Sequence, residues 1–272
     1  MLRQKWGSVV CPGCRNLVGV NDERCYNCGR WNPGLWGFAP ALNRFGRDLG
    51  FTPFVLSLCV VMYFFSLVAD VQGIRMGGGM DFLSPSSISL LLFGASGQVA
   101  VFAAGHWWTV LTASWLHGGF MHLLFNMMWL RQLAPDTAEI YGPSRMVIIY
   151  TISGVVGFSL STFMGTNITV GASAPIFGLL AALVYYGRRS GSSSIGRQAM
   201  TYAVMLFVFG LIASRVDNYA HLGGFVGGYA ASAFLDPLKP ERLDHMIVAF
   251  LCLGATILAL IVTFFTTRPF VS

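Results

Sequence analysis

The chain has 272 residues, of which 55% are hydrophobic and only 10% are charged. Ordinary soluble domains carry about 25% charged residues, so this composition excludes a chain whose main solvent is water. The formal net charge of +6 would suit a nucleic-acid partner, but the basic residues gather in alternate loops between apolar runs, which is typical of membrane orientation. We therefore expect a protein of the lipid bilayer with no nucleic-acid partner.

Residues 1–34 contain two pairs of cysteines, Cys11-Pro-Gly-Cys14 and Cys25-Tyr-Asn-Cys28. Each CxxC turn can present two thiolates to one ion, so the four cysteines predict a structural zinc site in a small zinc-ribbon-like module. So short a segment has almost no core and would need the metal to fold. Disulfides or a redox dithiol are alternatives that a reducing cytosol disfavours. The module could bind a cytosolic protein partner, regulate the rest of the chain, or serve as a cap.

Residues 35–50 contain Pro40 and scattered arginines, follow Pro33 and Gly34, and predict a linker that lies against the membrane surface. The first 50 residues lack the apolar stretch of a signal peptide, so we expect the N-terminus to be retained.

Apolar segments of roughly membrane-spanning length follow the linker. The expected spans are 53–69, 116–134, 145–164, 172–187, 199–213, 220–235 and 246–265. The fourth to sixth are short, which predicts helices whose ends stop inside the protein. The fold class is therefore all-α: a polytopic helical membrane bundle of about seven transmembrane helices, with a six-helix core over 51–240 and an additional C-terminal helix within 241–272.

Residues 70–115, between the first two spans, are too apolar for a solvated loop and too interrupted by Gly and Ser to cross the bilayer. Irregular backbone at membrane depth must be covered by protein or lie at the interface. We expect an interfacial or re-entrant element in the outer leaflet.

Lys and Arg are unevenly divided between the two sides of this arrangement. The N-terminal side would hold Arg3, Lys5, Arg15, Arg24, Arg30, Arg44, Arg47, Arg131, Arg145, Arg188, Arg189, Arg197, Lys239 and Arg242, and the opposite side only Arg75, Arg215 and Arg268. The positive-inside rule then predicts a multi-pass protein of the cell (plasma) membrane, with the N-terminus in the cytosol and the C-terminus outside.

Polar residues gather near the outer ends of the second, fourth and sixth spans, which should all run in the same direction. The second span carries His122 and Asn126, four residues apart and therefore on one helix face. The fourth begins at Gly171-Ala-Ser173, and the sixth carries His221. A serine, a histidine and several hydrogen-bond donors at one depth are the parts of an acyl-transfer site.

The chemistry of such a site assigns each group a role. A serine hydroxyl needs a neutral imidazole to accept its proton, which makes Ser173 and His221 the candidate nucleophile and base. His122, Asn126 and backbone N–H groups at the start of the fourth span could stabilise an oxyanion. Structural interpretations stay open, because serines in membrane helices often bond the backbone and an intramembrane histidine can serve a proton relay, a metal or an interhelical bond.

Four glycines at helix positions suit close contact between the spans. Gly224 and Gly228 form a GxxxG step, and Gly178 and Gly227 are further small positions. Without side chains, these positions would let helix backbones approach closely, which would bring Ser173 to the histidine of the sixth span.

Taken together, these segments resemble the rhomboid family of intramembrane serine proteases. The matching motifs are H-x4-H-x3-N at His117, His122 and Asn126, GxS at Gly171-Ala-Ser173, and Ala220-His221 followed by spaced glycines. The resemblance covers roughly residues 50–240. The last span looks like the extra helix of the family's six-plus-one members.

The resemblance implies that Ser173 is the nucleophile, that His221 is the general base and later the acid, and that His122 and Asn126 are oxyanion-hole donors. Gly171 would shape the turn before the serine. It implies an endopeptidase that cleaves transmembrane segments of other membrane proteins near the outer leaflet, with no metal or cofactor in the chemistry.

The sequence departs from the family pattern in two places. Ala174-Pro175 follows the serine where the family usually has glycine, and Trp107-Trp108-Thr109 lacks the arginine of the first loop. The alternative is a catalytically inactive rhomboid-like protein that binds or escorts membrane clients. A transporter or channel would need a path of polar residues at the midplane, and the spans offer few.

Overall fold

The computed structural model of the protein describes residues 3–14, 16–43, 48–213 and 215–267. Four of the arginines that enter the orientation argument, Arg15, Arg44, Arg47 and Arg268, lie outside the described residues. So do part of the predicted linker, 44–47, and the last five residues. The domain boundaries and the membrane orientation therefore stay predictions.

Each predicted span corresponds to a long helix. The helices are α2 (Phe51–Val68), α5 (Phe120–Tyr141), α6 (Pro143–Phe163), α7 (Ser173–Ser190), α8 (Ser193–Ile212), α9 (Asn218–Phe234) and α10 (Leu243–Thr267). The prediction of an all-α bundle is confirmed. The fifth span is longer than predicted and begins at Ser193, because its first turns carry exposed polar residues that a search for apolar runs leaves out.

Four of these helices, α2, α6, α8 and α10, are long and apolar enough to cross a membrane by length and composition. The other three, α5, α7 and α9, are shorter or more polar. These three helices also carry the candidate site residues. The polar side chains that make a site possible lower the mean hydropathy of the helices that carry them.

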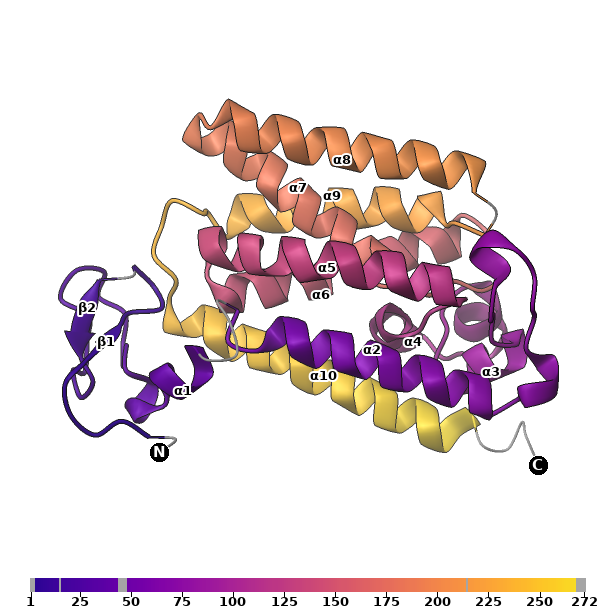
Figure 1. Cartoon of the computed structure of the whole chain (residues 1–272), viewed down its shortest axis with the longest axis horizontal. Coiled ribbons are helices and arrows are strands. Elements are labelled where there is room, and N and C mark those ends of the chain that lie inside the picture. Colours follow the sequence, from indigo (N-terminus) through magenta and orange to yellow (C-terminus); the bar gives the residue numbers. More distant parts are fainter. Residues whose placement is uncertain (1–2, 15, 44–47, 214, 268–272) are drawn as a thin grey trace.

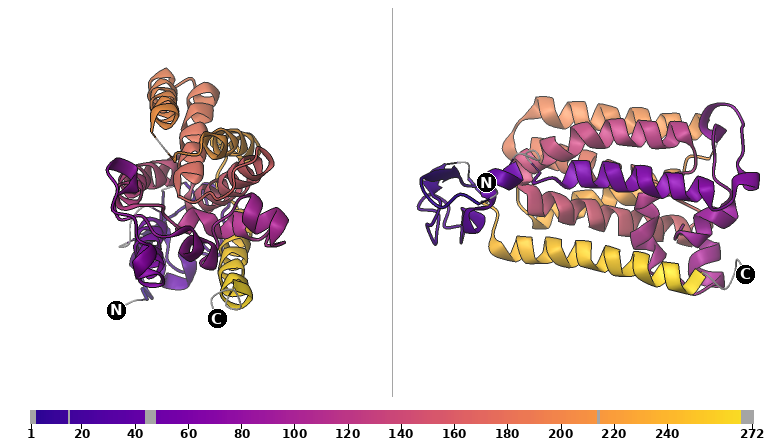
Figure 2. Two further views of the ribbon diagram at one scale, coloured as in Figure 1. Left: turned by 90° about the vertical axis from the view of Figure 1, so that its right-hand side faces the viewer. Right: turned by 60° about the horizontal axis from the view of Figure 1, so that its bottom comes forward.

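The long helices lie side by side in an elongated bundle with the cysteine module at one end (Figure 1). Seen end-on, α8 and α10 lie on opposite sides of the bundle, with the other long helices between them (Figure 2). Helices α5, α7 and α9 all run toward the module end, as predicted for the second, fourth and sixth spans. Their first residues therefore lie away from the module.

The predicted close approach of the helices at these glycines is confirmed. A Cβ at Gly228 of α9 would lie 2.4 Å from the Cα of Gly178 of α7, and one at Gly224 would lie 2.1 Å from the carbonyl oxygen of Ala174. A Cβ at Gly227 would lie 2.8 Å from Val156 of α6. Helix α9 thus packs backbone to backbone against α7 and closely against α6, which leaves no room for larger side chains.

The segment before α5 folds into short pieces, none of which could span a bilayer. They are Val71–Gly73, Gly79–Asp81, α3 (Ser87–Leu92), Val99–Ala103, α4 (Thr109–Thr112) and Ala113–Trp115. Helix α10 holds this segment at two points. The Trp108 indole donates to the hydroxyl of Thr263 at 3.0 Å, and the Thr267 hydroxyl donates to the carbonyl of Leu92 at 2.8 Å. These contacts anchor the loop that lacks the family's arginine.

The cysteine module contains two short antiparallel strands, β1 (Ser8–Val10) and β2 (Leu17–Gly19), and its own small cluster of buried residues. The predicted linker is partly helical, with turns at Leu35–Gly37 and α1 (Ala39–Asn43). The cluster consists of Val9, Val18 and Val20 with the cysteines themselves. A core this small agrees with a fold that depends on a metal.

A buried carboxylate joins this module to the bundle. Glu241, just before α10, accepts from Arg30 of the module at 2.5 Å and from the backbone N–H groups of Ser144 and Arg145 at 2.6 and 3.1 Å. The side chains of Arg30 and Glu241 are both almost fully buried. Arg145 in turn donates to three carbonyls between α9 and α10. One carboxylate therefore connects the module, the start of α6 and the loop before α10.

We expect Glu241→Gln to destabilise the folded protein by on the order of 3 kcal/mol, because it leaves the Arg30 guanidinium buried without a counter-charge. Thermal unfolding of the purified protein in detergent would measure the loss. Asp244→Asn is the matched control, since its pair with Arg242 is exposed and should contribute less than about 1 kcal/mol. Equal stability of the two variants would contradict this role for Glu241.

Candidate active site and metal centre

Ser173 is the first residue of α7, and its side chain is half-buried between the fully buried Ala172 and Ala174. The N–H groups of a first helical turn have no partner within the helix, so this serine lies beside free donors and the positive end of the helix dipole. Gly171, before it, adopts a left-handed φ of 128° and its N–H donates to the carbonyl of Ala113 at 2.9 Å. The turn that presents the serine is thus held by the segment before α5.

The alanine that replaces the family's usual glycine is accommodated by a glycine on the neighbouring helix. The Ala174 methyl lies 2.7 Å from the position of a Cβ at Gly157 of α6, so Gly157 leaves the space that this methyl needs. Pro175 likewise packs over Gly154, and its position in the first turn of the helix costs no internal hydrogen bond.

His221 is buried on the first turns of α9. The ring of Phe177 stacks on its imidazole, with the ring centroids 4.2 Å apart and the planes 15° apart. Because Phe177 lies one turn after Ser173, α7 supplies both the hydroxyl and the surface against which the imidazole rests. Nδ1 of His221 lies 3.1 Å from Oδ1 of Asn218.

Ser173, His221, His122 and Asn126 all line one cavity of about 270 Å³. The rest of the wall is largely apolar and comes mainly from α5, α7 and α8, including Phe125, Trp129, Ile176, Met205, Leu206 and Phe209. Met80 and the loops before α7 and α9 complete it. Among the described residues no hydrogen bond joins the Ser173 hydroxyl to the His221 ring. Catalytic hydrogen bonds in unliganded sites are often long and shorten when substrate binds.

A hydrogen bond to the ring of His122 determines which of its two nitrogens carries the proton. The Gly118 N–H donates to Nδ1 at 3.3 Å, so Nδ1 is an acceptor and the neutral ring has its proton on Nε2. A Cβ at Gly171 would lie 2.7 Å from this Nε2 and 3.7 Å from the Ser173 hydroxyl oxygen. The donor nitrogen of His122 therefore faces the turn that carries the serine.

Asn126 lies one turn further along α5. Its amide nitrogen donates to the carbonyl of His122 at 2.8 Å, and its second N–H is available to a ligand in the cavity. His117 lies behind this pair, fully buried, with its ring 5.3 Å from that of His122. Neither nitrogen of His117 has a hydrogen-bond partner within the described part of the chain.

Two residues at the start of α9 were missed by the sequence analysis, Asp217 and Asn218. The Asp217 carboxylate caps α9 by accepting from the Ala220 N–H at 3.0 Å, and it accepts from the hydroxyls of Thr169, at 2.6 Å, and Ser161. It therefore ties α9 to α6 and to the loop that leads into Ser173. An Asp directly before a predicted helix is a known N-cap signal and could have been recognised.

We expect Gly171→Ala to destabilise the folded protein. The left-handed backbone costs a non-glycine residue about 1–3 kcal/mol, and the new Cβ would collide with the His122 imidazole. Thermal unfolding measures the effect. Gly191→Ala is the control, because Gly191 is also left-handed at φ 76° but has nothing within 4 Å of its Cβ position. Equal unfolding temperatures for the two variants would show that the collision is unimportant.

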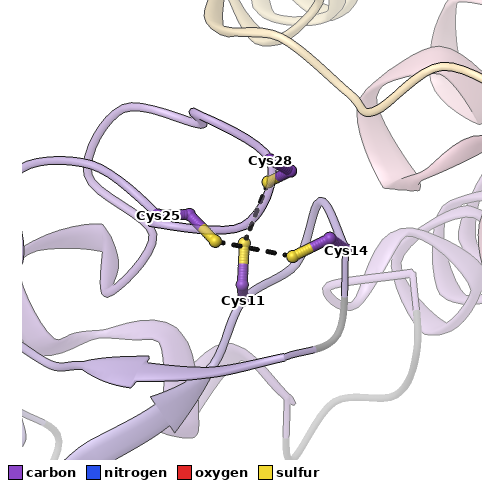
Figure 3. A group of neighbouring side chains, drawn as sticks. All are labelled: Cys11, Cys14, Cys25 and Cys28. Carbon is purple, nitrogen blue, oxygen red and sulfur yellow. Dashed lines mark hydrogen bonds between the residues drawn. The ribbon is translucent and has the colours of Figure 1, made fainter.

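The four cysteines of the module turn their sulfurs toward one another (Figure 3). All four Sγ atoms lie within 4.8 Å of one another, and two of the pairs are separated by 3.7 Å, for Cys11–Cys28, and 3.5 Å, for Cys14–Cys25. A tetrahedral zinc ion with Zn–S bonds of about 2.3 Å separates its sulfurs by about 3.8 Å. The donor set and its spacing therefore fit zinc, as the sequence predicts.

The thiols of this group are not equivalent. Burial raises the pKa of Cys11 and of Cys28. For Cys14 burial acts in the same direction, but hydrogen bonds from Asn27 and Asn16 outweigh it and lower the pKa to about 7. Because their pKa values are raised, Cys11 and Cys28 need a nearby cation to be held as thiolates, and a metal ion would supply it.

Comparisons with known proteins agree with these features. A family model described as "Rhomboid domain" matches residues 104–238. The chain is 32% identical over 208 residues to "Rhomboid protease GluP" of Bacillus subtilis (strain 168), which covers 75% of this chain and 38% of that protein. It is 33% identical over 146 residues to "Putative rhomboid protease YdcA" of the same organism, covering 52% of this chain and 72% of that protein.

A plant relative is also similar. The chain is 34% identical over 152 residues to "RHOMBOID-like protein 4" of Arabidopsis thaliana, which covers 54% of this chain and 39% of that protein. The chain thus spans well under half the length of two of these three relatives. The matched stretch of the family model includes α5 to α9 and all the candidate active-site residues.

Proposed function

Because the chain belongs to the rhomboid family, whose members are generally intramembrane serine proteases, we propose that it is a serine endopeptidase that cleaves transmembrane segments of other membrane proteins. The observation that carries the proposal is the cavity that Ser173, His221 and His122 line together. In the proposed orientation the N-terminus is cytosolic, the C-terminus is extracytoplasmic, and the cavity lies near the outer leaflet of the plasma membrane.

In the first step, the Ser173 hydroxyl oxygen attacks the scissile carbonyl carbon while Nε2 of His221 takes the hydroxyl proton. The tetrahedral intermediate then collapses, and the imidazolium returns this proton to the leaving amine, which leaves an acyl ester on Ser173. A water molecule then attacks the ester carbonyl carbon while His221 takes one of its protons. Collapse of this second intermediate breaks the ester bond, the imidazolium returns the proton to the Ser173 oxygen, and the carboxylic acid is released. Phe177, stacked on the imidazole, keeps the plane of the ring constant through both half-reactions.

The oxyanion of each intermediate needs donors that are already in place. Nε2–H of His122 faces the Ser173 turn, Asn126 keeps one free N–H, and the first turn of α7 adds backbone donors. Gly171 allows the close approach of the His122 ring. The apolar walls from α5 and α8 suit a transmembrane segment as substrate.

The cysteine module has no role in this chemistry. We propose that Cys11, Cys14, Cys25 and Cys28 hold one structural zinc ion and that catalysis uses no cofactor. The ion would supply folding free energy to a module with little core.

A fluorophosphonate that reacts with activated serines tests the proposal directly. We expect the purified protein in detergent to become labelled at Ser173 and to cleave a model transmembrane substrate, and prior labelling to block the cleavage. A protein that binds the substrate but neither cleaves it nor reacts at Ser173 would instead be the catalytically inactive client-binding relative.

A further inference from the structure

The side-chain amide of Asn218 is held in one orientation by two contacts. Its nitrogen lies 3.3 Å from the backbone carbonyl oxygen of Phe207 on α8, and its oxygen lies 3.1 Å from Nδ1 of His221. A backbone carbonyl can only accept, so the amide nitrogen must face Phe207. The amide oxygen, which can also only accept, must then face the histidine.

This orientation determines the protonation of the imidazole. An acceptor opposite Nδ1 requires a hydrogen on Nδ1, so the neutral His221 ring carries its lone pair on Nε2. That lone pair is what a base needs to take the Ser173 proton. We propose that Asn218 is a positioning residue that holds His221 in the Nδ1–H tautomer and keeps its hydrogen bond when the ring becomes an imidazolium. The proposal rests on the proposed protease function.

The neighbouring histidine shows the opposite arrangement. His122 accepts at Nδ1 from the Gly118 N–H, so its proton is on Nε2. Two histidines of one cavity are therefore held in opposite tautomers by different partners. The tautomer of His221 suits a base, and that of His122 suits a donor to an oxyanion, so the surrounding structure assigns different roles to two chemically identical side chains.

Space for the amide is provided by a glycine. A Cβ at Gly210 of α8 would lie 2.3 Å from Oδ1 of Asn218, so any side chain there would displace the amide from its place between Phe207 and His221. The preceding residue, Asp217, caps the helix. Asn218 is thus held by the capped end of α9 and by its contact with α8. A residue that orients an imidazole must itself be held in place.

The tautomer can be measured in the unaltered protein. In the full-length protein labelled with ¹⁵N-histidine, we expect the NMR shifts of His221 to report a protonated Nδ1 and those of His122 a protonated Nε2 at a pH where both rings are neutral. His221→Gln and His122→Gln samples assign the signals. A protonated Nε2 on His221 would overturn the proposal, and this measurement needs no substitution of Asn218. A failure of the proposed protease function would instead appear as absent cleavage, so the two failures can be told apart.

Variants provide the kinetic test. Asn218→Ala should lower kcat on the order of 10- to 100-fold with little change in KM, because the neutral ring is then free to adopt the unproductive tautomer. Asn218→Asp keeps an acceptor opposite Nδ1 and should recover a large part of this loss. Gly210→Ala should lower kcat by displacing the amide without removing it. Leu222→Ala, exposed on the same helix, is the control and should leave kcat unchanged. Equal kcat in wild type and Asn218→Ala would refute the proposal.

Discussion

Ser173→Ala is expected to abolish cleavage of a transmembrane substrate, with a loss of at least about 10³-fold in kcat. Without the hydroxyl no acyl-enzyme can form, and only the oxyanion donors and substrate binding are left to act on a direct attack by water. The measurement is the rate of appearance of cleaved model substrate with purified protein in detergent or proteoliposomes.

His221→Ala should cause a loss of similar size, and the double variant should be no slower than either single variant, because the two groups act in one proton transfer. Ser232→Ala is the control for the serine. Ser232 is also buried, on α9, and its hydroxyl donates to the carbonyl of Gly228. His245→Ala is the control for the histidine, since it lies at the start of α10, beside Arg242. Undiminished cleavage by the Ser173→Ala protein would end the assignment of the nucleophile.

Loss of the metal is expected to unfold the N-terminal module. Elemental analysis should find one equivalent of zinc in protein purified without chelators, and replacing Cys11 and Cys25 by serine should remove it. Structural zinc supplies about 10–16 kcal/mol of apparent binding free energy in small zinc peptides, and the few buried valines of the module could not replace this. The absence of metal from the wild-type protein would contradict the prediction.

Loss of the metal should also destabilise the helical bundle, beyond the module itself. Arg30 follows Cys28 closely in the chain and reaches Glu241 only when the module is folded, so metal loss should leave this buried carboxylate without its partner. We expect a lower unfolding temperature of the whole protein and faster amide hydrogen exchange at 142–146 and 235–242. Cys252→Ser is the control, because Cys252 lies in α10 and should change neither zinc content nor exchange. Normal exchange in the zinc-free protein would show that the module and bundle are independent.

Much of the fold could be predicted from the distribution of apolar residues. Every long helix was located from its hydrophobic run, but the boundaries were less accurate where polar residues continue a helix. Helix α5 passes through Pro135 and ends at Tyr141, beyond the predicted 134, and α8 begins at Ser193 rather than at 199. In both cases the added turns carry polar or charged residues, which hydropathy does not distinguish from a loop.

The candidate site was predicted in part. Its two histidines were recognised because imidazoles are rare and costly in membrane helices, and Ser173 and Asn126 were recognised because they complete an acyl-transfer site at the same depth. The start of α9 was overlooked, although Asp217 directly precedes the histidine helix and Asn218 is its first residue. Their roles depend on hydroxyls of Ser161 and Thr169 and on the carbonyl of Phe207, and such partners are not visible in a linear pattern.

By itself, the sequence determined that the solvent of the chain is the lipid bilayer, determined the class of fold, and pointed to the candidate reactive groups. Composition and hydrophobic run length depend on single residues and their near neighbours, and these are present in the chain before it folds. The tertiary structure alone decided the tautomers of His122 and His221, the pairing of Arg30 with Glu241, and the space around Gly171. Hydrogen-bond direction and steric fit depend on atoms brought together from distant segments, so they exist only once the helices have packed.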